Sequence, residues 1–588
     1  MAVLARRDRP DPSVLGPMVR VAPHRGSLAH SIERGDAILG ITESGYPGST
    51  SSTNEDGWAA VFCGALDNVD ELAADLHLDG PGETPHEPAA VTLAAYRRYG
   101  DDAPLHLRGA FAAIVSDGSR LICFRDHLGY GTLYFRDEPG AFYAATEQKQ
   151  VLAGARIGRD PDMDVLRDLF YKTDHGPEPC ALRGVSRLPK AAMIVADREG
   201  VRQRRYWHPE RLLETSTYSD GDVEERFDDL MTRAVSRMMT GHDVVSLSGG
   251  IDSPGVAAFA APRHRSIAGE PLAALSTVYP ELPSVDERGF IELVARYLGL
   301  DPLHVYEQTA RPLDEIEEWV ALVDGPTPTI SLPQYKEHYG KARALGYRNM
   351  LSGEVAELVI DMTMYRFPHL LLHGRFDAVR RDLTARRRRG ASLSSIGRAL
   401  VSAFTPSPIA RRRWRRNRDG VPDWVDLDMA NEAAVRSVVP PRERWRAVQL
   451  AWLEPVGITV EADEICQDLC GVRNRRPWTD VDLWEFFLSL PAEVKYPDGR
   501  SKTLVRRLLR GKLPDEILDR RDKTAFDDSM LESIDYQGLR RWLSEPTDRV
   551  PGVRYDRLQD KLERQELNVT DAMWAKDLAS IHAFLGTW

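Results

Sequence analysis

A glycine-rich corner that carries two hydroxyls and one carboxylate is the part of the sequence best suited to chemistry. The stretch VVSLSGGIDSPGVAAF, residues 244–259, contains Ser248, Gly249, Gly250, Asp252 and Ser253. A strand that turns into a helix through glycines gathers unpaired backbone N–H groups and the positive end of the helix dipole, and such a corner binds anions. The serines add hydroxyl donors, and the glycines let the backbone approach the anion closely.

The carboxylate of Asp252 narrows the anion to one class. A carboxylate repels phosphate unless a divalent cation lies between them, so the set predicts a Mg²⁺–polyphosphate complex with Asp252 as a metal ligand. The stretch is not a Walker A loop, since G-x-x-x-x-G-K-[ST] occurs nowhere in the chain. It is not a G-x-S-x-G nucleophile elbow, because Ser246 and Ile251 stand two positions before the two serines. A structural turn would need the glycines but not both serines and the aspartate.

The elements that must position this corner divide the chain into two parts. Residues 1–205 contain short apolar runs such as GWAAVFCG, GAFAAIVSD and RLICFRD, with helix-like segments between them. Within residues 206–588, the runs DVVSLSGG, LAALSTVYP and YRNMLSGE are typical of buried parallel strands that each precede a helix. Beyond residue 365 the pattern is helical throughout. We therefore predict an α/β multidomain chain: an N-terminal α+β domain, built as a layered β sandwich with helices, then a parallel-sheet α/β domain with helical additions.

Composition describes an ordinary soluble globular protein of two to four domains. The chain has 588 residues, of which 42% are apolar and 28% are charged. It opens without the apolar run of a secretory signal and has no stretch of about 18 apolar residues, so we expect no membrane span. The five cysteines form no zinc-ligand pattern, which favours free thiols in the cytoplasm: Cys63, Cys123, Cys180, Cys466 and Cys470.

The net charge of −12 conceals a strongly basic segment. Between residues 365 and 420 there are fifteen arginines and three aspartates, a local balance of +12. Two hypotheses account for this insertion. It is either a solvated helical face or an anion-binding surface for an acidic peptide or a nucleic acid.

Four motifs in order resemble those of the asparagine synthetase family. The SGGxDS loop (248–253) resembles the pyrophosphatase loop of the ATP-pyrophosphatase superfamily, whose members adenylate an oxygen of the substrate. NMLSGEVAELV (349–359) resembles the family's LSGEGxDE segment. RNRRPWTDVDLWEFFLSLP (473–491) and SKTLVRRLLRGKLPDEILDRRDKTAF (501–526) are similar to its RxPFLD and K-x-x-L-R … R-x-K stretches. In the N-terminal part, PHRG, FRDHLGYGTLYF and ATEQKQVLA look like the family's glutaminase domain.

The glutaminase-like part lacks the residues that would do its chemistry. A class II glutaminase uses an N-terminal cysteine as nucleophile, whereas Met1 is followed by Ala2. By the resemblance, Cys63 stands where the family has its oxyanion-hole asparagine, and Pro85 where it has a glutamine-binding aspartate. The resemblance therefore implies a degenerate domain without glutaminase activity, retained as a scaffold or docking surface.

Relatives without glutaminase chemistry use an amine already present in the substrate. These relatives are the β-lactam synthetases and the lasso-peptide cyclases. The chain looks most like a lasso-peptide cyclase in three features: its length, its Arg-rich insertion and the segment LDRRDKTAFDD. That resemblance implies an ATP- and Mg²⁺-dependent macrolactam synthetase. Such an enzyme adenylates an Asp or Glu side chain of a precursor peptide, and the peptide's N-terminal amine closes the ring. It implies the precursor (core) peptide as substrate, with a leader peptidase and a leader-recognition protein as further partners.

The resemblance also gives roles to single residues. Ser248, Gly249, Gly250 and Ser253 would hold the departing pyrophosphate. Glu357 would be the second magnesium ligand, after Asp252. Glu354 would orient or deprotonate the attacking amine, or else make a structural hydrogen bond.

Three further positions follow from the later motifs. Gly353 would let the backbone approach the adenine. Lys523 matches an essential lysine that would neutralise pyrophosphate and stabilise the oxyanion of the tetrahedral intermediate; the alternative is a surface lysine. Lys502 and Arg506 align with K-x-x-L-R as secondary phosphate or packing contacts. Arg475 and Asp480 are expected to form a structural ion pair.

Three other hypotheses stay open. The first is an amide ligase for a small molecule, including a β-lactam synthetase or an asparagine synthetase that draws on free ammonia. The second is an ATP-binding scaffold without turnover, which the presence of Asp252, Glu354 and Lys523 disfavours. The third, nucleic-acid modification, rests only on the arginine runs and would show as a steep salt dependence of binding.

Overall fold

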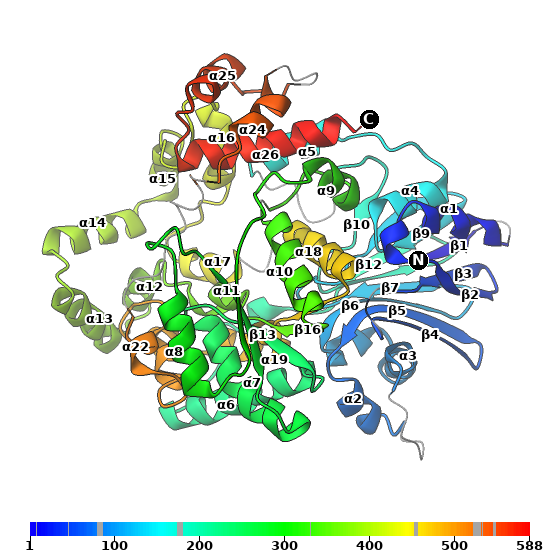
Figure 1. The fold of residues 1–588 in the computed structure, drawn as a ribbon, viewed down its shortest axis with the longest axis horizontal. Helices are drawn as coiled ribbons and strands as arrows, with labels where there is room; N and C mark the ends of the chain where they lie inside the picture. Colours follow the sequence, from blue (N-terminus) through cyan, green and yellow to red (C-terminus); the bar gives the residue numbers. More distant parts are fainter. Residues whose placement is uncertain are drawn as a thin grey trace.

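The computed structural model describes most of the chain and places its two halves side by side (Figure 1). It describes residues 1–588 apart from 7–8, 45, 47, 79–85, 173–179, 330, 452–456, 521–530, 532, 545–548 and 588, and only the backbone of 220, 399 and 457–459. No helix among these residues has both the length and the apolar content needed to cross a membrane.

The N-terminal half is built on two antiparallel sheets of six strands each. The first has the order β10 (Ser186–Arg187), β8 (Tyr134–Glu138), β9 (Ala141–Ala145), β1 (Ala2–Ala5), β3 (Ala37–Thr42) and β2 (Leu28–Arg34). The second has the order β12 (Val201–Arg205), β11 (Ala192–Ala196), β7 (Leu121–Arg125), β6 (Gly109–Ser116), β5 (Trp58–Leu66) and β4 (Thr50–Glu55). The predicted layered β sandwich is confirmed.

Alternation along the strands produces the layers. On β5, Ala59 and Val61 pack into the core between the two sheets, whereas Ala60 and Phe62 face the opposite side. That outer face is covered by α2 (Val69–Asp75) and α3 (Pro88–Tyr99). Because successive side chains on a strand point to opposite faces, one run of small and apolar residues supplies both cores. On the other sheet, α1 (Leu15–Arg20) and α4 (Gln148–Ala155) form the covering layer.

The C-terminal half contains a parallel five-stranded sheet with helices on both faces. The strand order is β15 (Leu303–Glu307), β14 (Ala273–Val278), β13 (Asp243–Ser246), β16 (Asn349–Leu351) and β17 (Arg473–Arg475). One face packs on α6 (Asp220–Met238), α7 (Asp252–Ala268) and α19 (Val481–Ser489). The other packs on α9 (Ile316–Val323), α10 (Leu332–Ala344) and α18 (Gly457–Cys470). The predicted parallel-sheet α/β domain is confirmed, but β17 corrects the expectation that only helices follow residue 365.

The Arg-rich segment forms a helical arm at one end of the molecule. Its helices are α12 (Arg366–Leu372), α13 (Phe376–Arg388), α14 (Leu393–Phe404) and α15 (Ser407–Trp414). Figure 1 shows α13 and α14 projecting from the body, while α15 lies higher, beside α16 (Leu427–Arg436). A small apolar cluster that includes Phe367, Leu370 and Val379 joins the arm to Trp445 and Tyr496.

Buried polar contacts join the two halves. Glu461 of α18 accepts a hydrogen bond from the Tyr134 hydroxyl at 2.6 Å and pairs with Arg187 at 2.9 Å. Elsewhere along the interface, Arg108 of the N-terminal half pairs with Asp482 at 2.9 Å. Buried charges need partners, and here each half supplies the partner for the other. The two halves are therefore held together by buried contacts and pack as one body.

Candidate active site

A cavity of about 630 Å³ opens where β13 and β16 end. Parallel strands finish at the same edge of a sheet, so loops distant in sequence meet there. Its walls come from the loop between β13 and α7, the segment after β16, and the residues that lead into α21 (Thr503–Leu508). It brings together most of the residues predicted from sequence: Ser248, Gly250, Asp252, Ser253, Gly353, Glu354, Glu357, Lys502 and Arg506.

Two serine hydroxyls shape the loop between β13 and α7. The N–H of Ser248 donates to Ser253 Oγ at 3.0 Å, and the two hydroxyl oxygens are also 3.0 Å apart. The N–H of Gly250 lies 3.4 Å from Ser248 Oγ. Because α7 begins at Asp252, its first N–H groups have no acceptor within the helix and the positive end of its dipole lies at the cavity wall. The loop has the composition and placement of an anion site.

Gly249 has a different role from the one predicted. Its N–H donates to the Glu287 carboxylate at 3.0 Å, and a Cβ at this position would lie 2.9 Å from the Cβ atoms of Glu287 and Phe290. The glycine is therefore required for contact with the start of α8 (Arg288–Leu298), and its amide is already bonded. The same Glu287 binds Arg520 at 2.8 Å. Arg520 lines the cavity and was missed by the sequence argument, although it stands within the quoted LDRRDK run.

Asp252 and Lys502 meet at the cavity wall. Asp252 Oδ2 accepts from Lys502 Nζ at 2.6 Å, while Asp252 Oδ1 is buried without a hydrogen-bond partner among the described residues. Lys502 stands just before α21 with φ near +56°, and its N–H donates to the carbonyl of Ile360 at 3.3 Å. The backbone thus holds the lysine in a left-handed conformation that places its ammonium on Asp252.

The acidic side chains at the cavity fit a magnesium ion that is shared with phosphate. The bare oxygen of Asp252 is an oxygen ligand of the kind Mg²⁺ prefers, and Glu357, on α11 (Ala356–Ile360), presents an exposed carboxylate to the same cavity. Within the described part of the chain, no three His, Cys, Asp or Glu side chains converge as a closed metal site. Mg²⁺ commonly keeps several waters and substrate phosphates with one or two carboxylates, which matches this donor set.

The structure gives Gly353 a packing role. A Cβ on Gly353 would lie 2.1 Å from the N of Ser253 and 2.4 Å from the carbonyl carbon of Asp252. The space that its missing side chain leaves is filled by the start of α7. Gly353 also lines the cavity, and its predicted approach to the adenine stays a prediction. Gly353 therefore allows the loops after β13 and β16 to touch, which closes one side of the cavity.

Glu354 is held by the strand next to its own. Its Oε2 accepts from Arg476 Nε at 2.8 Å and from Asn474 Nδ2 at 2.9 Å, and Oε1 has no hydrogen bond within the described residues. Asn474 lies on β17 and Arg476 directly follows it, whereas Glu354 follows β16. Neither Asn474 nor Arg476 was predicted as a site residue, although both lie in the quoted stretch RNRRPW. One carboxylate oxygen is fixed, and the other remains able to accept a proton.

Arg476 begins a chain of buried charges that crosses into the N-terminal half. Its guanidinium lies over the ring of Tyr130, 5.2 Å from the centroid, and Tyr130 belongs to the N-terminal half and lines the cavity. It also pairs with Asp463, which accepts from Tyr339 at 2.6 Å. The chain of ion pairs runs in the order Glu354, Arg476, Glu464, Arg473, Asp468, Arg25 and Glu147.

The expected ion pair between Arg475 and Asp480 is wrong. Arg475 binds Asp67 of the N-terminal half, whereas Asp480 binds Arg237 at 2.9 Å. Burial raises the pKa of Asp67 to about 6, and the Arg475 guanidinium opposes that rise. The Arg475–Asp67 pair joins the two halves, whereas the Asp480–Arg237 pair lies within the C-terminal half. Both residues are in structural ion pairs as expected, but with other partners.

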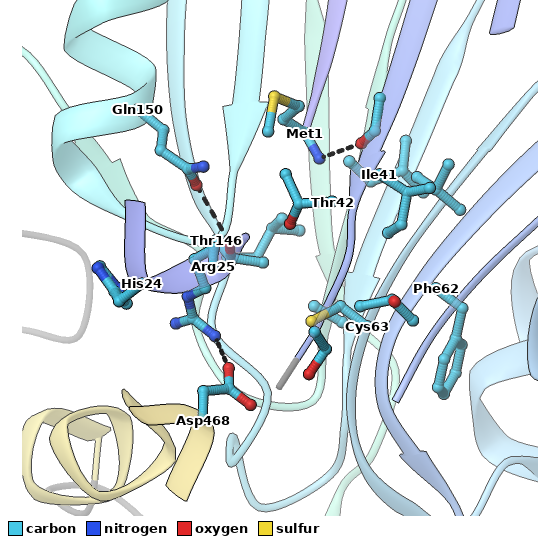
Figure 2. Close-up of a pocket in the computed structure, with 17 residues that line it drawn as sticks. Met1, His24, Arg25, Ile41, Thr42, Phe62, Cys63, Thr146, Gln150 and Asp468 are labelled. Atoms are coloured by element: carbon cyan, nitrogen blue, oxygen red, sulfur yellow. Dashed lines mark hydrogen bonds and ion pairs between the residues drawn. The ribbon is translucent and has the colours of Figure 1, made fainter. Parts of the chain in front are cut away.

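A second, much smaller cavity lies in the N-terminal half, where the resemblance places a glutaminase site (Figure 2). Its volume is about 40 Å³, and Cys63 lies in its wall. Figure 2 shows Arg25 directed toward Asp468 of α18, which also lines the cavity. The amine of Met1 donates to the carbonyl of Gly40 at 3.0 Å. Burial raises the pKa of the Cys63 thiol, which keeps it protonated.

Two predicted positions lie outside the described residues. These are Lys523, the proposed catalytic lysine, and Pro85, the replacement in the glutamine-binding segment. Both remain predictions. Arg506, by contrast, lines the cavity and donates to the carbonyl of Leu518, which fits the packing contact expected of it.

Comparison with known proteins identifies two family matches. Residues 226–585 match the model of asparagine synthase, and residues 13–207 match that of a glutamine amidotransferase domain. Asparagine synthetase [glutamine-hydrolyzing] 3 of Bacillus subtilis is 23% identical over 536 residues, which cover 88% of this chain and 82% of that protein. Carboxyethyl-arginine beta-lactam-synthase of Streptomyces clavuligerus is 33% identical over 215 residues, or 36% of this chain and 38% of that protein. A solved glutamine phosphoribosylpyrophosphate amidotransferase from B. subtilis aligns at 13% identity and a TM-score of 0.26, covering 52% of this chain and 80% of that one.

Proposed function

Because the chain belongs to the asparagine synthase family, whose members are ATP-dependent amide ligases, we propose that it closes a macrolactam in a precursor peptide. The enzyme adenylates an Asp or Glu side chain of the peptide, and the peptide's own N-terminal amine displaces AMP. The products are the cyclic amide of a lasso peptide, AMP and pyrophosphate. The glutaminase-like half contributes no ammonia.

The observation that carries the proposal is that one cavity is lined by two groups of residues suited to two different reactants. The loop with Ser248, Asp252 and Lys502 forms one wall, and the Glu354–Arg476 pair forms another. The first wall suits a triphosphate, and the second offers a fixed carboxylate to an amine. At about 630 Å³ the cavity falls in the range of sites that hold drug-sized ligands.

Adenylation is the first step. A carboxylate oxygen of the substrate attacks the α-phosphorus of ATP, a new P–O bond forms, and the bond to the β-phosphate breaks with release of pyrophosphate. The N–H groups at the start of α7, the serine hydroxyls and the ammonium of Lys502 are the donors placed to stabilise the charge on the leaving group. Asp252 and Glu357 would hold Mg²⁺, which supplies charge neutralisation of the phosphates when bound.

Amide formation is the second step. The amine nitrogen attacks the carbonyl carbon of the acyl-adenylate, the C–O bond to AMP breaks, and the nitrogen loses a proton. Glu354 Oε1 is the acceptor suited to that proton, since Oε2 is fixed by Arg476 and Asn474. Lys523 stays the proposed donor to the oxyanion. Holding amine and carbonyl in one geometry can lower the barrier by about 7–11 kcal/mol.

Two features of the N-terminal half support the proposal that the attacking amine belongs to the peptide substrate itself. Its cavity of about 40 Å³ has room for one or two waters but not for a glutamine side chain. The Cys63 thiol has a raised pKa, the opposite of a nucleophilic cysteine. Without released ammonia, the amine must come from the substrate or the solvent.

A small-molecule ligase of the β-lactam-synthetase kind is the second candidate, favoured by the 33% identity to carboxyethyl-arginine beta-lactam-synthase over 215 residues. A leader peptidase and a leader-recognition protein are proposed partners of the peptide ligase alone. Substrate chemistry therefore separates the two candidates.

The deciding experiment measures ATP–pyrophosphate exchange and AMP release by the full chain. The substrates compared are linear peptides with one internal Asp or Glu, the same peptides with a blocked N-terminus, free aspartate with ammonia or glutamine, and small amino diacids. We expect exchange with peptides, and a product lighter than the peptide by one water only when the N-terminus is free. Exchange with a small acid and not with any peptide would overturn the peptide assignment.

A further inference from the structure

A third cavity, of about 400 Å³, lies in the Arg-rich arm. It is beside the 630 Å³ cavity of the candidate active site. It is lined chiefly by apolar side chains, including Met364, Phe367, Ile396 and Leu400. The two cavities are neighbours, because Asp361 lines the active-site cavity and Thr363, two positions further along the chain, lines the cavity in the arm.

Apolar side chains on this arm remain exposed around the cavity. Met364 is 61% exposed, and Leu393 and Val401 on α14 are each 72% exposed. Adjacent exposed apolar residues on a soluble protein mark a contact surface more often than isolated ones do. We name the cavity, together with these exposed residues, the arm surface; it lies on residues 363–365 and on α12, α13 and α14.

The charges around the arm surface are positive. Arg386 lines the cavity and Arg387, Arg388 and Arg398 are exposed on the same helices. The buried Asp382 is already occupied by Arg366 at 3.1 Å and Arg386 at 2.8 Å. Among the described residues, Arg387, Arg388 and Arg398 have no ion-pair partner, so the arm surface carries uncompensated positive charge. An occupant with carboxylates would be attracted and held.

We infer that the arm surface binds an acidic segment of the peptide substrate, with an aliphatic or aromatic side chain in the 400 Å³ cavity and Asp or Glu residues against α13 and α14. This inference rests on the proposed function, since the segment is contiguous with the residue whose carboxylate is adenylated. It makes the arm a specificity element for the peptide, and not a general anion surface.

The test measures the KM and kcat for AMP release with a peptide substrate in the full chain. Arg387→Glu/Arg388→Glu reverses two charges at the arm surface, and Met364→Asp places a carboxylate at the mouth of the cavity on an exposed residue. The matched control is Arg412→Glu/Arg413→Glu on α15, an equal charge reversal on exposed residues beside α16 and away from α13 (Figure 1). We expect the first two variants to raise the KM for peptide at least about tenfold with little change in kcat, and the control to stay within about twofold.

A second peptide gives an independent comparison. In it, the acidic residues other than the acceptor are replaced by Asn or Gln. The wild-type enzyme should show a raised KM for this peptide, whereas Arg387→Glu/Arg388→Glu should no longer distinguish the two peptides. Equal KM values for all variants would overturn the inference, as would tighter, steeply salt-dependent binding of tRNA or duplex DNA to the arm. Absence of AMP release by the wild-type enzyme with every peptide would instead overturn the proposed function.

Discussion

Arg476 and Glu354 follow the ends of two neighbouring strands, β17 and β16, and are joined by a hydrogen bond of 2.8 Å between Nε and Oε2. The buried guanidinium of Arg476 is itself held in place by an ion pair with Asp463 and by the ring of Tyr130 beneath it. Through this bond it fixes the orientation of the Glu354 carboxylate and leaves Oε1 without a bond among the described residues. A general base must keep one geometry while it accepts a proton, and this pair supplies that condition. This geometry is the reason for proposing Glu354 as the base of ring closure and not of adenylation.

Glu354→Gln should separate the two half-reactions. The amide oxygen can still accept from Arg476, but the side chain can no longer take a proton, so ring closure should fall by about 10²–10⁴-fold. ATP–pyrophosphate exchange should be nearly unchanged. Both rates are measured on the same peptide, and a variant that closes the ring at the wild-type rate would remove Glu354 from the chemistry.

Asp252→Asn should abolish the first half-reaction. The variant keeps the size of the side chain but loses the charge on the bare oxygen, so exchange should fall by about 10²–10³-fold, as expected for loss of several kcal/mol of charge stabilisation. Raising the Mg²⁺ concentration should restore part of the activity. Wild-type exchange at low Mg²⁺ would show that Asp252 binds no metal.

Gly353→Ala and Gly250→Ala form a matched pair. The first places a Cβ 2.1 Å from the N of Ser253, whereas the second brings its Cβ no closer than 3.5 Å to Ser248 Oγ. We expect Gly353→Ala to lower the free energy of unfolding by about 1–3 kcal/mol and to reduce exchange, and Gly250→Ala to have little effect on stability. Denaturant unfolding of both variants measures this, and equal losses would contradict the packing role of Gly353.

Lys495 makes the stability of the fold depend on pH. Burial lowers the pKa of Lys495 to about 7, and only Glu214 opposes the shift. Between pH 7 and about 10 the unfolded chain therefore binds one more proton at this site than the folded chain, so the stability of the fold rises with pH in this window. Lys495→Met should stabilise the protein at pH 7 by up to about 4 kcal/mol.

The measurement for this variant is the unfolding midpoint at pH 7.0 and pH 9.5. The gain of Lys495→Met over wild type should shrink at the higher pH, because the wild-type lysine is then less costly in the folded state. A gain that is the same at both pH values would place the cause in packing and not in titration.

Arg25 and Asp468 should be coupled across the two halves. Arg25→Gln removes the guanidinium that Asp468 and Glu147 share, so it should cost more stability than Asp468→Asn, on the order of 3–5 kcal/mol. The double variant should cost less than the two single losses added together. Strict additivity in thermal unfolding would show that the pair makes no energetic contribution.

The sequence was a better guide to which side chains line the site than to which distant residues they contact. Ser248, Asp252 and Ser253 could be found because a run of serines, glycines and a carboxylate after an apolar segment has few structural explanations. The roles of Gly249 and Gly353 could not, since each depends on a neighbour far away in the chain: Glu287 for one and Ser253 for the other. When two loops pack closely, neither loop has a sequence pattern that reveals the contact.

The two arginines at the end of β17, Arg475 and the next residue Arg476, show the same limit. Successive residues on a strand point to opposite faces, so Arg475 reaches Asp67 in the N-terminal half while Arg476 reaches Glu354. Which of the two faces the cavity depends on the register of a three-residue strand, and that register is set by pairing with β16. A stretch this short carries no alternation from which to predict it.

Tyr130 has a practical consequence for anyone who wishes to shorten the protein. Its ring forms part of the wall of a cavity that otherwise belongs to the second half of the chain, and it shields a guanidinium whose other side meets carboxylates. A truncated enzyme that starts near residue 206 would admit water at that point and leave Asp468 without the guanidinium of Arg25. The second half of the chain therefore cannot be expected to work alone, and an engineered version should keep the amidotransferase-like half for the wall and the ion pairs that it supplies.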